Sequence, residues 1–178
     1  MKIKTIFLGL IMSISTLFSQ NTKYLGVELA GSYGMAGISL DSRLSKSSKF
    51  GYKIGLSYGM EYNSGARHWY ITPVKAYYPE DGKMNNVYSI PLNVHYLLGR
   101  EKHFLETGIG LCAFYADYNV GEHKGLGYYA FGRVAYRHES VANRFMFSLG
   151  MDIPFMTPAS GLGYSIAIAP ALTIAYRL

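Results

Sequence analysis

One group of residues in the sequence has the side-chain types needed for nucleophilic catalysis. His138 and Ser140 are two positions apart, and a carboxylate follows at Asp152. In such a set the histidine deprotonates the serine for attack on an ester, and the carboxylate orients the histidine. The spacing does not favour this chemistry, because Ser140 falls in a predicted turn and Asp152 lies near the far end of the next predicted strand. We therefore predict no catalytic residues and no enzymatic activity.

The histidines and the cysteine are not spaced as metal ligands. No His-x-His or His-Glu-x-x-His pattern occurs among the five histidines, which are His68, His95, His103, His123 and His138. The single cysteine, Cys112, excludes an internal disulfide and a cysteine-cluster metal site. Glycine-rich stretches fall within predicted strands rather than at the start of a helix, so no phosphate-binding loop is indicated. We predict no metal site and no cofactor.

A further set of charged residues alternates with bulky apolar residues along the chain. This set comprises five acids and five bases: Glu28, Asp41, Arg43, Lys53, Glu61, Glu106, Arg133, Arg137, Asp152 and Arg177. In a narrow interior of low dielectric, an unpaired charge costs several kcal/mol. Equal numbers of the two signs therefore predict a mutually neutralising network inside the fold. The alternative is a solvated outer face on which the two signs happen to balance.

The elements that would position these charges are β-strands. From Tyr24 to Leu178, bulky apolar residues alternate with small or polar ones at a period of two. The predicted strands span residues 24–33, 37–45, 52–62, 87–98, 104–118, 127–138, 145–155 and 164–178. Most of these segments reach the roughly 9–11 residues that a tilted strand needs to cross a bilayer. The prediction is an all-β fold, an eight-stranded antiparallel up-and-down transmembrane β-barrel.

The connector lengths fit the same architecture. Those at 45–49, 99–102 and 139–143 are short, whereas those at 63–86, 119–126 and 156–163 are longer. Outer-membrane barrels have short periplasmic turns and longer extracellular loops. The first hairpin, near Gly34, is the exception to this trend.

The apolar face is predicted to point outward to lipid. Eight strands enclose a space that side chains just fill, and five or six large apolar residues from each strand would overfill it. Tyr and Phe also gather near the segment ends, as expected for aromatic belts at the two lipid–water interfaces. One belt comprises Tyr24, Tyr96, Phe104, Tyr136, Phe145 and Tyr176, and the other Tyr33, Tyr62, Tyr88, Tyr115, Tyr128 and Tyr164. A soluble barrel with its apolar face inside is the alternative.

The N-terminus has the layout of a secretory signal peptide. Two lysines precede an apolar run from Ile6 to about Phe18, and small and polar residues follow. We predict a signal peptide over residues 1–19 and the barrel over residues 20–178, with an uncleaved anchor helix as the alternative. The 17 Lys and Arg against 11 Asp and Glu give +6, and loss of Lys2 and Lys4 leaves 15 against 11, or +4. This scattered excess is too small to predict nucleic-acid binding.

Five stretches of the chain carry a resemblance to known proteins. They are the first hairpin through SLDSRL, IPLNVHYLLGREKHFLETGIG at 90–110, AYRHE at 135–139, RFMFSLGMDIPF at 144–155, and the closing ALTIAYRL. In these stretches the chain resembles a family of small, largely uncharacterised outer-membrane β-barrel proteins of Bacteroidota. The resemblance implies an eight-stranded barrel in the outer membrane of a Gram-negative cell, inserted by the barrel-assembly machinery. It implies no catalytic residues. The chain ends in Leu178, where such barrels usually end in Phe.

The His-x-Ser pair with a later carboxylate is similar to that of outer-membrane lipid A 3-O-deacylases. That family carries the pair on its penultimate strand, near the loops, whereas here a whole hairpin follows the pair. A lipid A ester hydrolase therefore stands as the alternative function, and a narrow channel as a third.

The segment at 63–86 is the most informative for function. It carries Arg67, Trp69, Tyr70, Tyr77 and Tyr78, a mixture of aromatic and basic residues typical of contact hot spots. The alternative is a loop that packs over the barrel mouth or extends its two strands. We predict a small plugged barrel with a structural or accessory-subunit role, which docks a partner through this loop or its outer wall. Outer-membrane lipid or lipopolysaccharide and another outer-membrane protein are the expected partners.

Overall fold

The structure is a computed structural model that describes the backbone of residues 22–45, 47–63, 68–70, 84–120, 123–140, 142–156 and 168–178. The elements are β1 (Lys23–Ala30), the 3-10 turn η1 (Gly31–Tyr33), β2 (Ala36–Arg43), β3 (Phe50–Asn63), β4 (His68–Tyr70), β5 (Met84–Arg100), β6 (His103–Val120), β7 (His123–Glu139), β8 (Phe145–Met156) and β9 (Ala169–Arg177). Within these residues, no helix is both long and apolar enough to cross a membrane.

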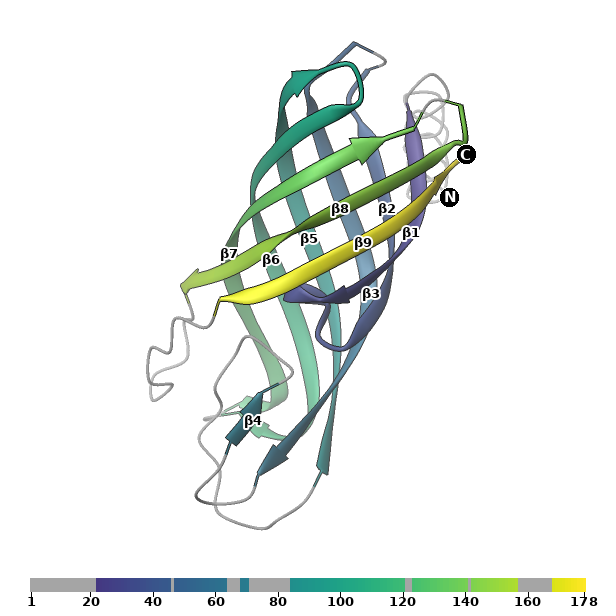
Figure 1. Cartoon of the computed structure of the whole chain (residues 1–178). Coiled ribbons are helices and arrows are strands. Elements are labelled where there is room, and N and C mark those ends of the chain that lie inside the picture. Colours follow the sequence, from purple (N-terminus) through teal and green to yellow (C-terminus); the bar gives the residue numbers. More distant parts are fainter. Residues whose placement is uncertain are drawn as a thin grey trace, which may run out of the picture.

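The strands close into a barrel (Figure 1). Each strand pairs antiparallel with its neighbours in the order β2-β1-β9-β8-β7-β6-β5-β3, and a β2–β3 ladder joins the two ends of this order. The short β4 adds to the end of β3 through residues 61–63 and 68–70. The prediction of a closed eight-stranded antiparallel barrel is therefore confirmed.

The wall is much taller on one side than on the other. Strands β3, β5, β6 and β7 have 14, 17, 18 and 17 residues, whereas β1, β2 and β9 have 8, 8 and 9. In Figure 1 the long strands continue well past the ends of β1 and β2, toward β4. The first hairpin consequently lies partway along the neighbouring wall.

Two connectors differ from the sequence prediction. The prediction of a loop at 119–126 is wrong, because β6 and β7 pair again at Asn119–Lys124 and Val120–His123 after a register shift beyond Tyr115. Backbone hydrogen bonds extend this hairpin through residues that are too polar to show the apolar alternation. Within 63–86, β4 and the start of β5 also add strand residues. Residues 164–167 of the last predicted strand lie outside the described residues, and β9 begins at Ala169.

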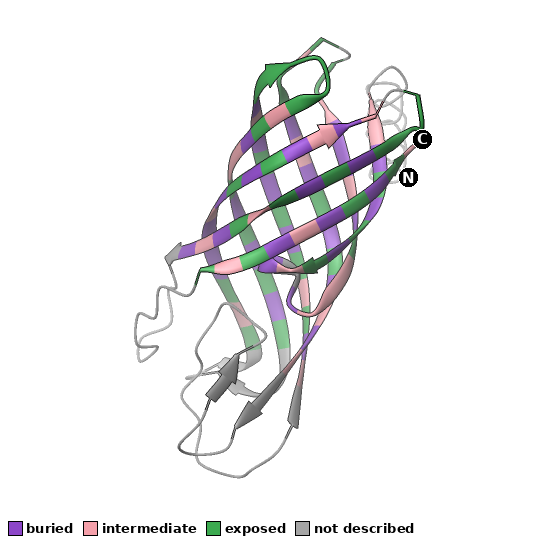
Figure 2. Ribbon diagram, in the orientation of Figure 1, coloured by how far each residue is buried: buried purple, intermediate pink, exposed green. Residues whose placement is uncertain are grey.

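The two faces of the wall differ sharply in polarity (Figure 2). Along most strands, buried and exposed residues alternate, and the exposed face carries large apolar side chains such as Leu56, at 58% exposure, and Ile109, at 68%. The buried face carries charged, small and a few aromatic residues. The predicted outward direction of the apolar face is therefore observed.

Two members of the predicted aromatic belts face inward instead. Tyr24 is only 3% exposed, and its ring lies 5.4 Å from the guanidinium carbon of Arg137. The reason is strand parity, since Leu25 points outward and its neighbour must point inward. Phe104 has the parity of the buried Glu106, so it also turns toward the interior.

The remaining described belt residues lie on the outer face or pack with residues that do. Tyr136, Phe145 and Tyr176 are exposed at the end with short turns, and Tyr96 packs against Phe50 with ring centroids 4.6 Å apart. Tyr88, Tyr115 and Tyr128 are exposed toward the other end. The side chains of Tyr33 and Tyr62, and the whole of Tyr164, lie outside the described residues.

Candidate functional site

The barrel interior holds a fully buried ion cluster, which we call the central cluster. It is built from Glu28 of β1, Lys53 of β3, Glu106 of β6, Arg133 of β7 and Asp152 of β8. The Arg133 guanidinium lies 2.7 Å from Glu28, 3.1 Å from Glu106 and 3.3 Å from Asp152. The Lys53 ammonium lies 3.0 Å from Glu28 and 3.9 Å from Glu106. One guanidinium thus ties together carboxylates from three strands.

Thr173 of β9 completes the central cluster. Its hydroxyl oxygen lies 2.6 Å from a carboxylate oxygen of Glu28 and donates to it. The same oxygen accepts a hydrogen bond from Arg133 at 3.2 Å. The central cluster therefore includes side chains from six of the eight barrel strands. Such cross-barrel links fix the strands against one another as well as neutralising charge.

A second group, the rim cluster, lies nearer the end with short turns. Arg137 donates to both carboxylate oxygens of Asp41, at 2.8 and 3.1 Å. It also donates to Glu139 at 2.8 Å and to Glu106 at 3.3 Å. Arg43 pairs with Glu139 at 2.5 Å. Because Glu106 contacts both Arg133 and Arg137, the two clusters form one connected network.

The predicted network residues divide into three groups. The buried members of the two clusters are Glu28, Asp41, Lys53, Glu106, Arg133, Arg137 and Asp152, with Arg43 half-buried at the edge. Arg177 is half-exposed and forms no ion pair with any residue that the structure describes. The side chain of Glu61 lies outside the described residues.

Glu139 is the member that the sequence prediction missed. The connector lengths predict a short turn at this residue, but β7 runs through it and it is only 8% exposed. The period-two pattern already contained the signal, since Arg133, Arg137 and Glu139 share one strand face. His95 is also buried, since it alternates with the exposed Val94, and neither of its ring nitrogens has a hydrogen-bond partner among the described residues.

The first hairpin folds into the interior on the other side of the central cluster. Ser32 of η1 is buried, and its backbone N–H donates to Asp152 at 2.7 Å. Its carbonyl oxygen accepts from the Tyr129 hydroxyl at 3.4 Å and from the Cys112 thiol at 3.7 Å. Gly31 and Gly34 have φ of +63° and +64°, which only glycine adopts readily. These glycines allow the hairpin to turn inward.

An apolar layer continues the filling beyond the hairpin. Val87, Cys112, Phe114, Tyr129 and Phe131 form one buried group. The Tyr129 ring lies 6.2 Å from that of Phe114 and 6.1 Å from that of Phe131. Ions, an inward hairpin and aromatic rings therefore follow one another along the barrel axis.

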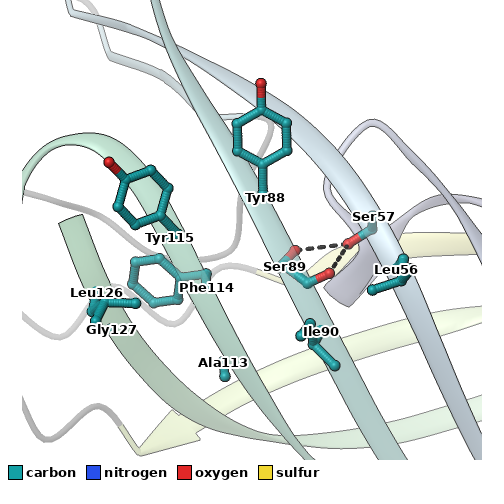
Figure 3. Close-up of a pocket in the computed structure, with 10 residues that line it drawn as sticks. All are labelled: Leu56, Ser57, Tyr88, Ser89, Ile90, Ala113, Phe114, Tyr115, Leu126 and Gly127. Carbon is teal, nitrogen blue, oxygen red and sulfur yellow. Dashed lines mark hydrogen bonds between the residues drawn. The ribbon is translucent and has the colours of Figure 1, made fainter.

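The outer wall has shallow apolar grooves around Leu56. The groove in Figure 3 has a volume of about 430 Å³ and is lined by residues of β3, β5, β6 and β7. Beside it, the hydroxyls of Ser57 and Ser89 lie 2.7 Å apart. The β3–β5 ladder resumes there after a gap opposite Pro91, which has no N–H to donate. The groove therefore lies next to a locally weakened seam.

The candidate catalytic residues do not form a triad. Asp152 lies inside the barrel, where it bonds Ser32 and Arg133. His138 of β7 pairs with Phe147 of β8, which is five positions along β8 from Asp152. The Nδ1 of His138 lies 3.5 Å from the Nδ1 of His103. The Ser140 hydroxyl accepts from the backbone N–H of Asn143. The carboxylate therefore contacts neither of the other two residues.

The predicted partner-binding residues lie largely outside the described part of the chain. The backbone of Trp69 and Tyr70 belongs to β4, and Tyr70 pairs with Glu61 of β3. Arg67, Tyr77 and Tyr78 lie outside the described residues.

The fold and this interior define a class of protein: a closed antiparallel eight-stranded barrel, apolar outside and ionic inside. No family model matches the chain, and no curated protein matches it. Among solved structures, it is similar to a major outer membrane protein from Thermus thermophilus, with 14% identity and a TM-score of 0.47. That alignment covers 89% of this chain and 99% of the other.

Proposed function

We propose that the protein is an integral barrel of the outer membrane of a Gram-negative cell. The observation that carries this proposal is the polarity of the wall, with large apolar side chains exposed outside and the ion network inside. A contiguous apolar surface of this extent is unusual on a soluble monomer, where such patches rarely exceed a few hundred Å². The cleaved signal peptide and insertion by the barrel-assembly machinery belong to the same proposal.

The end with short turns faces the periplasm in this proposal. The turns at 99–102 and 139–143 close hairpins there, whereas β3 and β5–β7 extend furthest at the opposite end. This is the usual arrangement of outer-membrane barrels, whose periplasmic turns are short. The taller wall and β4 would then stand at the cell surface.

The interior supports a sealed barrel rather than a solute channel. The central cluster crosses the lumen, and the first hairpin lies against Asp152. We propose that the protein acts as a structural or accessory subunit. It would dock a partner, another outer-membrane protein or lipopolysaccharide, through its outer wall or the segment at 63–86. The proposed function is not enzymatic.

Reconstitution into planar bilayers tests the sealed interior. The purified barrel should first migrate as a heat-modifiable band in electrophoresis, because a folded barrel resists detergent until it is heated. The same preparation should then give no stable conductance steps. Ion-selective openings from the heat-modifiable form would contradict a sealed interior, and failure to enter detergent micelles at all would contradict a membrane barrel.

Lipid A from a deletion strain tests the non-enzymatic role. Its acylation pattern should match that of the parent strain. If deletion changes the pattern, and the wild-type gene restores the parental pattern but the Ser140→Ala gene does not, the protein would be an ester hydrolase instead.

A further inference from the structure

Two histidines meet on the outer wall at the end with short turns. His103 begins β6, and His138 lies near the end of β7, directly opposite it in the ladder. Their Nδ1 atoms are 3.5 Å apart, and their ring centroids are 4.7 Å apart. Neither residue belongs to the interior network.

The strand register is the reason that these rings come so close. The backbone N–H of Glu139 donates to the carbonyl of Lys102 at 2.8 Å. A bond between these flanking positions makes His103 and His138 a non-hydrogen-bonded pair, the type in which opposite side chains are closest. The two-residue turn at 101–102 directly precedes His103 and joins β5 to β6, so His103 has a paired strand on each side.

A third donor atom converges on the same point. The Tyr136 hydroxyl lies on the same face of β7 and is 2.6 Å from the Nδ1 of His103. The two aromatic rings are stacked at 29°, with centroids 6.0 Å apart. Two imidazole nitrogens and one phenol oxygen therefore lie at one exposed spot.

The spacing of the two nitrogens matches a shared metal ion. Zn²⁺ holds imidazole nitrogens at about 2.0–2.1 Å, so two tetrahedral ligands of one ion lie roughly 3.3 Å apart. Imidazole is a preferred ligand of Zn²⁺ and Cu²⁺, and Cu²⁺ binds most tightly among the first-row divalent ions. Mg²⁺ and Ca²⁺ prefer oxygen ligands instead.

We propose that His103 and His138 form a surface site for an imidazole-preferring divalent transition metal, which displaces the Tyr136 hydroxyl from the Nδ1 of His103 when it binds. Water or a second molecule would complete the coordination shell. Arg100 lies opposite His103 on β5 and adds a positive charge beside the site. This charge repels a bound cation, so the site would be of moderate affinity, suited to reversible loading.

Electron paramagnetic resonance of Cu²⁺ added to the folded barrel in detergent tests this site. One equivalent of Cu²⁺ should show coupling to two nitrogens, and Zn²⁺ but not Mg²⁺ should displace it. His103→Gln and His138→Gln should each abolish the two-nitrogen signal, whereas His68→Gln should retain it. Tyr136→Phe should tighten Cu²⁺ binding, because it removes the hydroxyl that competes with the ion for the Nδ1 of His103. Tyr176→Phe, which removes a hydroxyl from the same belt, should have no effect.

The outcomes separate the site from adventitious binding. Heat-modifiable migration of every variant shows that the barrel is folded, so loss of the signal reports on the ligands. Arg100→Gln should tighten Cu²⁺ binding, because it removes the neighbouring charge. The proposal is overturned if the wild-type spectrum lacks two-nitrogen coupling, or if either histidine variant retains it.

Discussion

Arg133 shows how a single residue organises the barrel interior. Its guanidinium contacts carboxylates from β1, β6 and β8, and it is 2% exposed. Arginine suits this position because its planar group remains charged and offers five N–H donors to several acceptors. Lys53, which has a single charged nitrogen, contacts only two of these carboxylates. The interior therefore depends more on the arginine than on the lysine.

Replacing Arg133 should destabilise the barrel strongly. Arg133→Met keeps much of the volume but leaves Glu28 and Asp152 short of a cation, so we expect a loss of about 3–5 kcal/mol in the free energy of unfolding. Urea titration in lipid vesicles, followed by heat-modifiable mobility, measures this change. Arg144→Met, at an exposed turn, should stay within about 0.5 kcal/mol. Equal stability of the two variants would show that the network contributes little.

Strand parity in the sequence predicts the inner-face positions of individual charged residues. Glu28, Lys53 and Asp152 each lie between outward-facing apolar residues, and all three are buried. The aromatic type of Tyr24 gives the wrong prediction, because the parity set by Leu25 turns this ring inward. The pairing of His103 with His138 is not predictable from the sequence, because only the β6–β7 register brings these distant residues together.

The first hairpin is the element whose position the sequence did not predict. Gly31 and Gly34 indicate a tight turn, but the inward direction depends on Asp152, which is 120 positions from Ser32. Strand bounds were predictable because alternation is a local property. The extension of β6 and β7 was not, since paired backbone in polar residues carries no apolar signal.

Gly31→Val should push this hairpin out of the interior. A Cβ on Gly31 would lie 2.7 Å from both the Ala171 Cβ and the Asp152 Oδ2, and φ there is positive. Cys112, which is fully buried beneath Ser32, should then become accessible to a water-soluble maleimide. Mass spectrometry should show faster labelling than in the wild type. Ser47→Val, in an exposed turn, should label as slowly as the wild type, and unchanged labelling of Gly31→Val would refute the inward plug.

In the whole molecule, closure of the sheet into a barrel determines which residues can occupy each of its two faces. The β2–β3 ladder removes the free edges that an open sheet would expose, so every strand in the barrel has two neighbours. Closure also makes one face the interior, which an eight-stranded barrel can fill only with side chains of limited total volume. Charged and small residues inside, with leucines outside, satisfy this limit and fit the proposed location in a membrane.

Charge placed on the outer wall should therefore be costly in proportion to depth. Leu56→Arg, near the middle of the apolar band, should lower the free energy of unfolding in vesicles by about 2–4 kcal/mol. Leu44 lies beside a turn, so Leu44→Arg should lower the free energy of unfolding by only about 0–1 kcal/mol. Urea titrations of both variants provide the comparison. A similar cost at the two positions would argue against a bilayer around the wall.

A nitroxide at Ile109 provides the sharpest test of whether the outer wall contacts hydrocarbon. Ile109→Cys in a Cys112→Ser background places the label on an outward residue that is 68% exposed. Collision rates with oxygen, which concentrates in lipid, and with a water-soluble nickel chelate are measured after reconstitution. We predict frequent collisions with oxygen and few with the chelate at this position, and the reverse at Ser47→Cys in the exposed turn. Chelate collisions at Ile109 as frequent as those at Ser47 would show that water, and not lipid, surrounds the outer wall.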